Sequence, residues 1–280
     1  MSNEPRVYRQ SSLQVILMIV AFSVLGIGLV ISMAFVEFQY LLLALGVLGV
    51  TFTIALYSQT LKTIISDSEI STQSLLGVKS LRWTEISRVS GSGNGIKLHN
   101  FDGDVTLAPS TQLPGYEEIV ETIGSKRPDL FDPLEYKEMK KSWPAWATIV
   151  IFAIFFIGMI LGFIFAFINT PNSSAALFLP AGMSSILLIV FLVVILSSPQ
   201  AVTLNGNSLL LTYLFKEKTV LADEVSSVSL SFIQTRNGKN YFVQLNQRNK
   251  KTLKISSLGP GLPILYLVLK NWHAKNSKLV

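Results

Sequence analysis

The stretch that decides the fold is PAWATIVIFAIFFIGMILGFIFAFI, residues 144–168, which has 25 residues and no charged side chain. A second apolar run, residues 177–196, follows after a short polar loop. At about 1.5 Å per helical residue, either run reaches across a hydrocarbon core of roughly 30 Å. The sequence therefore predicts a membrane-spanning helical hairpin over residues 143–197.

Two earlier apolar runs, residues 13–35 and 38–57, are separated only by Val36 and Glu37. The first run is too long for the core of a signal peptide and lacks a well-placed cleavage site, so we expect a retained span. So short a connection makes the two helices antiparallel neighbours. We therefore predict a first hairpin over residues 13–58, ahead of the second one.

The remaining sequence has the composition of two small soluble pieces. Half of all residues are hydrophobic and only 14% are charged, but the excess lies in the four apolar runs. Residues 59–142 carry ten basic against twelve acidic residues, and residues 199–280 carry eleven against three. The chain has no cysteine, which excludes disulfides, thiolate metal ligands and cysteine catalysis.

The positive charges near the span ends all lie on one side of the predicted hairpins. The two opposite loops hold only Glu37 and, over residues 169–176, no charge. By the positive-inside rule, both termini and both soluble pieces are expected in the cytoplasm. The basic residues used here are Arg6, Arg9, Lys62, Lys137, Lys140, Lys141, Lys216 and Lys218.

Both soluble pieces have the pattern of short strands followed by one amphipathic helix. In the first piece the helix covers residues 114–126, and in the second it starts at Pro263. Asn205-Gly206 predicts a tight hairpin turn. Agreement in element order indicates a duplication. The predicted segments are a cytoplasmic segment 1–12, hairpin 13–58, domain 59–127, linker 128–142, hairpin 143–197, domain 198–274 and tail 275–280, with an interfacial helix considered for the linker.

Four segments of the first piece occur in a recognisable order: ISDSEI (65–70), SLRWTEISRV (80–89), TLAPS (106–110) and PGYEEIVETI (114–123). In this order they resemble the bacterial pleckstrin-homology-like domains of membrane-embedded type. Trp83, Glu85 and Ile86 match a recurrent feature of that family. The second piece has Ala222 in place of the Trp, and is recognisable mainly through its element order and Asp223-Glu224-Val225.

The resemblance implies a fold and a kind of function. It implies an α+β membrane protein in which each transmembrane α-hairpin precedes a partly open barrel of seven antiparallel strands, capped by a C-terminal helix. It also implies multi-pass placement in a bacterial cytoplasmic membrane, and a binding or scaffolding role without catalysis. The alternative from another class is an accessory subunit of a transport or export complex, with a membrane or cytosolic protein as partner.

Two sets of side chains are candidate contact sites. Small residues let helices approach closely, which makes Gly158, Gly162, Ala181 and Ser185 candidates for helix packing, either within the hairpin or in a homo-oligomer. The basic second domain is a candidate for attraction to anionic lipid head groups. Its proposed contacts are Lys216, Lys218, Lys250, Lys251 and Lys254, for which ordinary solvated charge is the alternative.

The sequence offers no pattern for catalysis, a metal or a cofactor. His99 and His273 are the only histidines, and Asp102 and Asp104 flank Gly103 as in a hairpin turn. The glycine-rich residues 90–95 lack the Lys-Ser/Thr end of a phosphate loop. The spans hold no ionisable residue, which argues against a transporter, and no aromatic platform supports nucleic-acid binding. We therefore expect a non-enzymatic protein.

Overall fold

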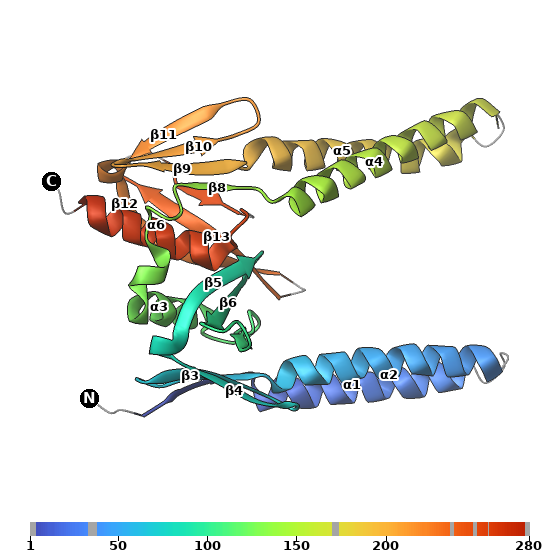
Figure 1. Cartoon of the computed structure of the whole chain (residues 1–280). Helices are drawn as coiled ribbons and strands as arrows, with labels where there is room; N and C mark the ends of the chain where they lie inside the picture. Colours follow the sequence, from blue (N-terminus) through green and yellow to red (C-terminus); the bar gives the residue numbers. More distant parts are fainter. Residues whose placement is uncertain are drawn as a thin grey trace. The chain divides into compact units, whose positions relative to one another are not determined.

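The computed structural model describes residues 4–32, 38–169, 174–235, 238–248, 251–256 and 258–277 (Figure 1). The chain divides into two compact units. Unit 1 comprises Met1–Ser90, Gly95–Leu130 and Thr235–Lys239, and unit 2 comprises Gly91–Asn94, Phe131–Gln234 and Asn240–Val280.

Unit 1 begins with one strand, which is followed by a pair of apolar helices, the remaining strands and a terminal helix. A four-stranded antiparallel sheet has the order β1-β2-β3-β4, and a second sheet has the order β5-β6-β7. The elements are β1 (Arg6–Arg9), α1 (Ser12–Ser32), α2 (Phe38–Thr60), β2 (Lys62–Ile65), β3 (Glu69–Ser74), β4 (Gly77–Arg82), the 3₁₀ turn η1 (Trp83–Glu85), β5 (Ile86–Ser92), β6 (Gly95–Asn100), β7 (Thr106–Leu107) and α3 (Tyr116–Lys126).

Unit 2 has the same order of elements. Its sheets have the orders β11-β10-β9-β8 and β12-β13-β14. The elements are η2 (Pro128–Phe131), which spans the boundary, β8 (Glu138–Lys140), α4 (Trp143–Asn169), α5 (Ser174–Ser197), β9 (Ala201–Asn205), β10 (Ser208–Thr212), β11 (Glu217–Leu221), η4 (Ala222–Glu224), β12 (Val225–Thr235), β13 (Gly238–Gln247), β14 (Leu253–Ile255) and α6 (Leu262–Asn276).

The terminal helices supply much of the core, as their sequence periodicity predicts. The stripe on α3, formed by Tyr116, Ile119, Val120 and Ile123, is fully buried. On α6, the predicted stripe of Leu265, Val268, Leu269 and Trp272 is buried as well. Strands contribute by alternation, so that β6 buries Ile96 and Leu98 while Lys97 between them is exposed. The predicted α+β class with antiparallel sheets is confirmed.

The linker prediction is wrong in one respect. Residues 128–142 do not form an interfacial helix, because η2 occupies one end and β8 pairs antiparallel with β9 at the other. Met139 is buried between exposed Glu138 and Lys140, which is the alternation of a strand. The Lys141 N–H donates to the Gln200 carbonyl at 2.9 Å, so sheet pairing satisfies backbone groups that a helix would have satisfied internally.

Two of the described helical stretches are long and apolar enough to cross a membrane, by length and composition. They are Trp143–Asn169 and Pro180–Ser197, which lie in the predicted hairpin over residues 143–197. The apolar stretches of α1 and α2 are shorter, Val15–Ile31 and Leu42–Tyr57. The structure thus gives membrane-length helices for the second predicted hairpin only.

Candidate functional site

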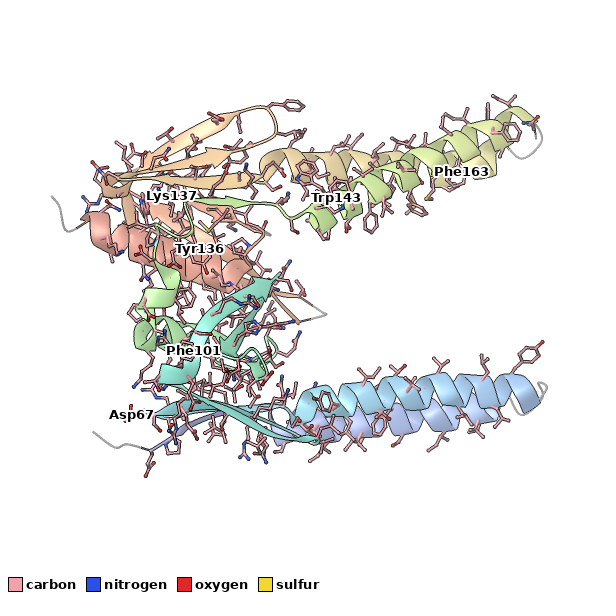
Figure 2. All side chains as sticks on the ribbon, viewed as in Figure 1. Asp67, Phe101, Tyr136, Lys137, Trp143 and Phe163 are labelled. Carbon is pink, nitrogen blue, oxygen red and sulfur yellow. The ribbon has the colours of Figure 1, made fainter. Side chains whose placement is uncertain are left out.

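Helices α4 and α5 contact each other, in part through aromatic side chains. The Phe191 ring of α5 lies with its centroid 6.2 Å from that of Phe152 and 5.9 Å from that of Phe156. Ser184 and Ile195 of α5 are buried, whereas α4 contains no buried residue. Figure 2 shows side chains projecting outward along both helices. The pair therefore presents an apolar surface that a soluble protein would cover.

The candidate packing glycines lie away from this contact. A Cβ added at Gly158 or Gly162 would meet no described heavy atom within 4 Å, and both residues are exposed. Ala181 and Ser185 are half-buried, and the Ser185 hydroxyl donates to the Ala181 carbonyl of its own helix at 2.9 Å. Packing of α4 on α5 thus does not account for the glycine pair. Its use against a helix of another chain stays a prediction.

Each apolar helix pair is bracketed by two strands that pair with each other. In unit 1, β1 precedes α1 and pairs antiparallel with β2, which follows α2. In unit 2, β8 precedes α4 and pairs antiparallel with β9, which follows α5. Because paired strands lie about 4.8 Å apart, the chain leaves and re-enters each sheet at neighbouring positions. Neither β1 nor β8 was predicted from the sequence.

A hairpin turn with exposed apolar side chains lies beside each of these re-entry points. Lys62, which begins β2, pairs with Gln73, and the β3–β4 turn that follows exposes Leu76 to 87%. Ala201, which begins β9, pairs with Thr212, and the β10–β11 turn that follows exposes Phe215 to 85%. Each unit therefore carries an apolar turn next to the end of its helix pair.

The candidate lipid-contacting lysines are distributed over two hairpins of unit 2. Lys216 follows the β10–β11 turn, with its ammonium 5.0 Å from the Tyr213 ring centroid. Lys218 of β11 donates to the Gln247 Oε1 atom at 3.4 Å, and the Lys254 ammonium of β14 lies 4.8 Å from the centroid of Phe242. Lys251 is exposed in the loop before β14, and Lys250 lies outside the described residues.

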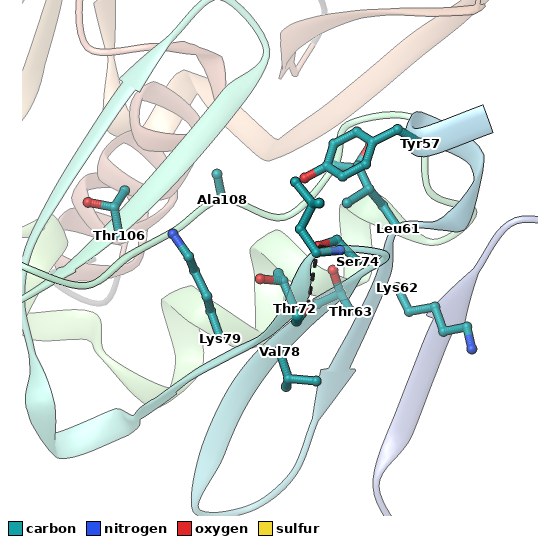
Figure 3. Close-up of a pocket in the computed structure, with 13 residues that line it drawn as sticks. Tyr57, Leu61, Lys62, Thr63, Thr72, Ser74, Val78, Lys79, Thr106 and Ala108 are labelled. Carbon is teal, nitrogen blue, oxygen red and sulfur yellow. Dashed lines mark hydrogen bonds between the residues drawn. The ribbon is translucent and has the colours of Figure 1, made fainter. Parts of the chain in front are cut away.

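A cavity of about 470 Å³ opens in unit 1 between the end of α2 and the sheet (Figure 3). Its lining contains hydroxyl and lysine side chains and no acidic residue. Tyr57 at the end of α2 and Thr63 of β2 belong to one stretch of chain, and Lys79 of β4 and Thr106 of β7 belong to two others. Three separated stretches therefore meet there. One feature of the sequence hints at this cavity, because Thr63 is a polar residue at an inward position of β2, beside inward Ile65.

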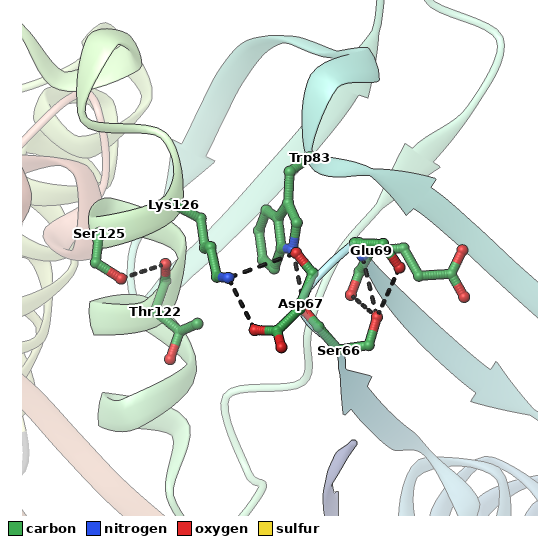
Figure 4. Close-up of polar contacts among 8 residues, drawn as sticks. Ser66, Asp67, Glu69, Trp83, Thr122, Ser125 and Lys126 are labelled. Carbon is green, nitrogen blue, oxygen red and sulfur yellow. Dashed lines mark hydrogen bonds and ion pairs between the residues drawn. The ribbon is translucent and has the colours of Figure 1, made fainter. Parts of the chain in front are cut away.

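The residues that carry the family resemblance have structural roles. Trp83 is buried and its Nε1–H donates to the Ser66 carbonyl at 3.1 Å (Figure 4). The Glu85 carboxylate accepts the Arg82 N–H at 3.0 Å. Ile86 is fully buried. These contacts hold η1 and the start of β5, and so position the sheets instead of forming a ligand site.

Arg127, just after α3, contacts η1 and the start of β5. One guanidinium nitrogen donates to the carbonyls of Trp83 and Ile86, and the other nitrogens bond to the Asp129 carboxylate, at 2.6 Å for the shortest contact. The hydrogen bonds from Arg127 lower the pKa of Asp129 below its usual value. The pair thereby fixes the turn that leaves α3.

His99 is held by hydroxyl groups on both ring nitrogens. Nε2 lies 2.7 Å from the Ser90 hydroxyl, and Nδ1 lies 3.1 Å from that of Thr106. Burial, followed by the positive charges of Arg88 and Lys97, lowers the pKa of His99. Within the part of the chain that the structure describes, no group of three or more His, Cys, Asp or Glu side chains is arranged to hold a metal ion.

Comparisons with known proteins give no family assignment. No protein-family model matches the chain, and a search of curated proteins finds no match.

Proposed function

We propose that the chain is a non-enzymatic integral membrane protein that presents two cytosolic pleckstrin-homology-like domains as a binding or scaffolding module. The bacterial cytoplasmic membrane is the proposed location. In this proposal α1–α2 and α4–α5 are two membrane hairpins, and units 1 and 2 are duplicated domains on one side of the bilayer. Protein partners would bind at the sheets and loops, and anionic lipids at the basic face of unit 2.

The observation that carries the proposal is the strand pairing across each apolar helix pair. A chain that crosses a bilayer twice returns to the side from which it left. Pairing of β1 with β2, and of β8 with β9, requires this return within each unit. The exposed apolar surface of α4 and α5 needs lipid or another chain to cover it.

The exposed apolar turns support a membrane contact for each unit by itself. Leu76 and Phe215 are exposed to 87% and 85%, next to the ends of α2 and α5. Aromatic and aliphatic side chains at this level would enter the head-group region, where Lys216 beside Phe215 would meet anionic lipid. The turns would then fix the height of each domain at the membrane surface.

Cysteine labelling in intact cells tests the topology, because the chain has no native cysteine. Asp102→Cys and Glu217→Cys place one thiol in each unit, at exposed positions. We expect an impermeant maleimide to label neither in intact cells and both in inverted vesicles. Asn172→Cys, between α4 and α5, should show the opposite pattern. Labelling of Asp102→Cys and Glu217→Cys from opposite sides would refute the duplicated plan.

Depth is tested by an environment-sensitive fluorophore on the same cysteine-free background. A label at Phe215→Cys or Leu76→Cys should show blue-shifted emission in liposomes, since the turn enters a less polar layer. Phe101→Cys is the matched control, because Phe101 is 75% exposed in a turn of unit 1 that is remote in sequence from the helix ends. Equal emission at all three positions would remove the proposed contact.

The second candidate function is an accessory subunit of a transport or export complex. The exposed positions of Gly158 and Gly162 on α4 favour it, because they leave a small-residue face free for a helix of another protein. Purification in mild detergent separates the two candidates. Co-purification with a transporter that is lost in Gly158→Leu would favour the accessory role.

A further inference from the structure

The buried hydroxyl of Thr63 lacks a partner in unit 1. Thr63 is only 1% exposed, and its Oγ1 atom makes no hydrogen bond with any described residue. Buried polar groups in folded proteins are nearly always hydrogen-bonded, because an unpaired group loses its water without compensation. Thr63 lines the cavity of about 470 Å³, so a ligand in that cavity can supply the missing partner.

The lining of this cavity has the chemistry of an anion site. It includes two lysines, several hydroxyl groups and no acidic side chain. Lys79 reaches from β4 toward Thr106 and Ala108, whereas the Lys62 ammonium points away from them (Figure 3). Among the described residues, Lys79 makes no ion pair. Its charge is therefore available to a ligand.

Other hydroxyls in the lining are already oriented. The Ser74 hydroxyl lies 3.2 Å from the Leu76 N–H and 3.3 Å from the Gly77 carbonyl, which fixes the β3–β4 turn. The Thr106 hydroxyl is held by His99 at 3.1 Å. Such fixed neighbours make the site preorganised, which reduces the entropy lost on binding.

We propose that this cavity binds the phosphate group of a small anionic ligand, with Lys79 as the cation and the Thr63 hydroxyl as the buried donor. A cavity of this size lies within the range of small-molecule sites, about 300–1,000 Å³. Phosphate oxygens accept from both groups, and charge-assisted hydrogen bonds of this kind are the strong ones.

Two sources of phosphate share this chemistry. Tyr57 of α2 and Leu76 of the apolar turn both line the cavity, so under the proposed function its mouth lies at the head-group layer, where the phosphate would belong to an anionic lipid. A soluble phosphate ester would bind through the same groups. The cavity itself does not depend on the membrane proposal.

The test uses the full chain and two probes. In detergent micelles, titration calorimetry with glycerol 1-phosphate measures binding of the soluble form, with glycerol as the probe that lacks phosphate. In nanodiscs of phosphatidylcholine that contain phosphatidylglycerol, native mass spectrometry of the released protein counts retained phosphatidylglycerol. Binding of glycerol 1-phosphate would identify a soluble ligand, and retention of phosphatidylglycerol alone would identify a lipid. Either result supports the site.

Four variants make the test specific. Thr63→Val and Lys79→Gln should each weaken binding on the order of tenfold, as loss of one charge-assisted hydrogen bond predicts. Ser71→Ala and Lys97→Gln are the controls, because Ser71 is another buried hydroxyl of the same sheet and Lys97 is an exposed lysine of β6, and neither lines the cavity. Both controls should stay within about twofold of the parent affinity.

Thermal stability separates a ligand-binding role of the Thr63 hydroxyl from a structural one. Val has nearly the same shape without the hydroxyl, so under the proposal Thr63→Val should raise the melting temperature of the ligand-free chain while it weakens binding. A hydroxyl that stabilised the fold would instead make the melting temperature of Thr63→Val lower. No saturable binding of either probe, equal binding of glycerol, or affinity unchanged in both cavity variants would overturn the proposal. The topology labelling needs no ligand, so it can succeed when this test fails.

Discussion

Units 1 and 2 bury an indole at corresponding turns, but they take it from different elements. The Trp83 N–H donates to the Ser68 carbonyl at 3.1 Å, and the Ala222 N–H donates to the Asn207 carbonyl at 2.9 Å, which makes Trp83 and Ala222 structural equivalents. In unit 1, the Trp83 side chain donates to the Ser66 carbonyl. In unit 2, Trp272 of α6 donates instead to the Gly206 carbonyl at 2.7 Å.

Unit 2 therefore has an indole at this turn although Ala222 occupies the position equivalent to Trp83. Ala222 is fully buried, so a large side chain there would need space that its neighbours occupy. Trp272 is 1% exposed and belongs to the helix that closes unit 2. Among the described residues, each unit thus has one buried indole at this turn, supplied by η1 in unit 1 and by α6 in unit 2.

The largest expected effect is loss of either indole. Trp83→Ala should lower the free energy of unfolding of unit 1 by about 3–5 kcal/mol, and Trp272→Ala should do the same in unit 2, since each removes a buried aromatic ring and its hydrogen bond. Hydrogen exchange of the full chain in detergent resolves the two units, with peptides that cover β6 and β13. Each variant should accelerate exchange in its own unit.

Trp143→Ala is the matched control for both indole variants. Trp143 is 81% exposed at the start of α4, so its removal should leave exchange in β6 and β13 unchanged. If Trp272→Ala proved as mild as Trp143→Ala, the indole of unit 2 would not replace that of unit 1, and the comparison would fail.

The next largest effect on stability concerns a side chain at or just after the terminal helix of each unit, which contacts a backbone carbonyl at the start of a strand. Arg127 donates to the Ile86 carbonyl in unit 1, and the His273 Nε2 atom lies 2.9 Å from the equivalent Val225 carbonyl in unit 2. Arg127→Met should destabilise unit 1 by about 2–3 kcal/mol, because two carbonyls and Asp129 lose their partner. Exchange in β5 measures this loss. If Arg127→Met lowered the free energy of unfolding by less than the loss of an exposed ion pair does, Arg127 would not stabilise unit 1 through these carbonyls.

The sequence predicted regular elements well because their periodicity is local. The α3 and α6 stripes and the apolar helices follow from spacing within one segment. The hairpin predicted at Asn205-Gly206 is present with its two turn residues one position later, at 206–207. The short strands β1 and β8 were missed because their partners follow a whole helix pair later in the chain. The role of Trp272 was missed for the same reason: it depends on a contact with Gly206, 66 residues away.

Sequence reasoning placed candidate site residues less well than it placed elements. The glycine spacing on α4 identified small residues but not their direction, and larger side chains such as Phe156 form the contact with α5. The unit 1 cavity is lined by residues from separate parts of the chain, among them Tyr57, Lys79 and Thr106 together with Thr63, so no motif in the sequence predicts it. The lysines of unit 2 remain a prediction, since charge alone does not identify a ligand.

A smaller effect is the pH dependence of the stability of unit 1. It comes from His99 of β6, whereas β13, the corresponding strand of unit 2, contains no histidine. Because the pKa of His99 is lowered in the folded chain, the folded state favours the neutral ring. The unfolded chain then binds more protons as the pH falls below about 6.5, so unit 1 should lose stability on acidification through that range. His99→Gln should flatten this dependence in exchange of β6. An unchanged pH profile would show that another group is responsible.

The smallest expected effects are those of the exposed ion pairs near the terminal helices. Lys126 contacts Asp67 at 3.1 Å in unit 1, as Figure 4 shows, and Lys275 contacts Asp132 at 2.9 Å in unit 2. Water and salt screen both pairs, so Lys126→Met and Lys275→Met should each cost less than about 1 kcal/mol, and less still at high salt. Lys126 adjoins Arg127, which makes it the matched control for Arg127→Met. A loss for Lys126→Met as large as that for Arg127→Met would mean that net charge, and not the carbonyl contacts of Arg127, stabilises the end of α3.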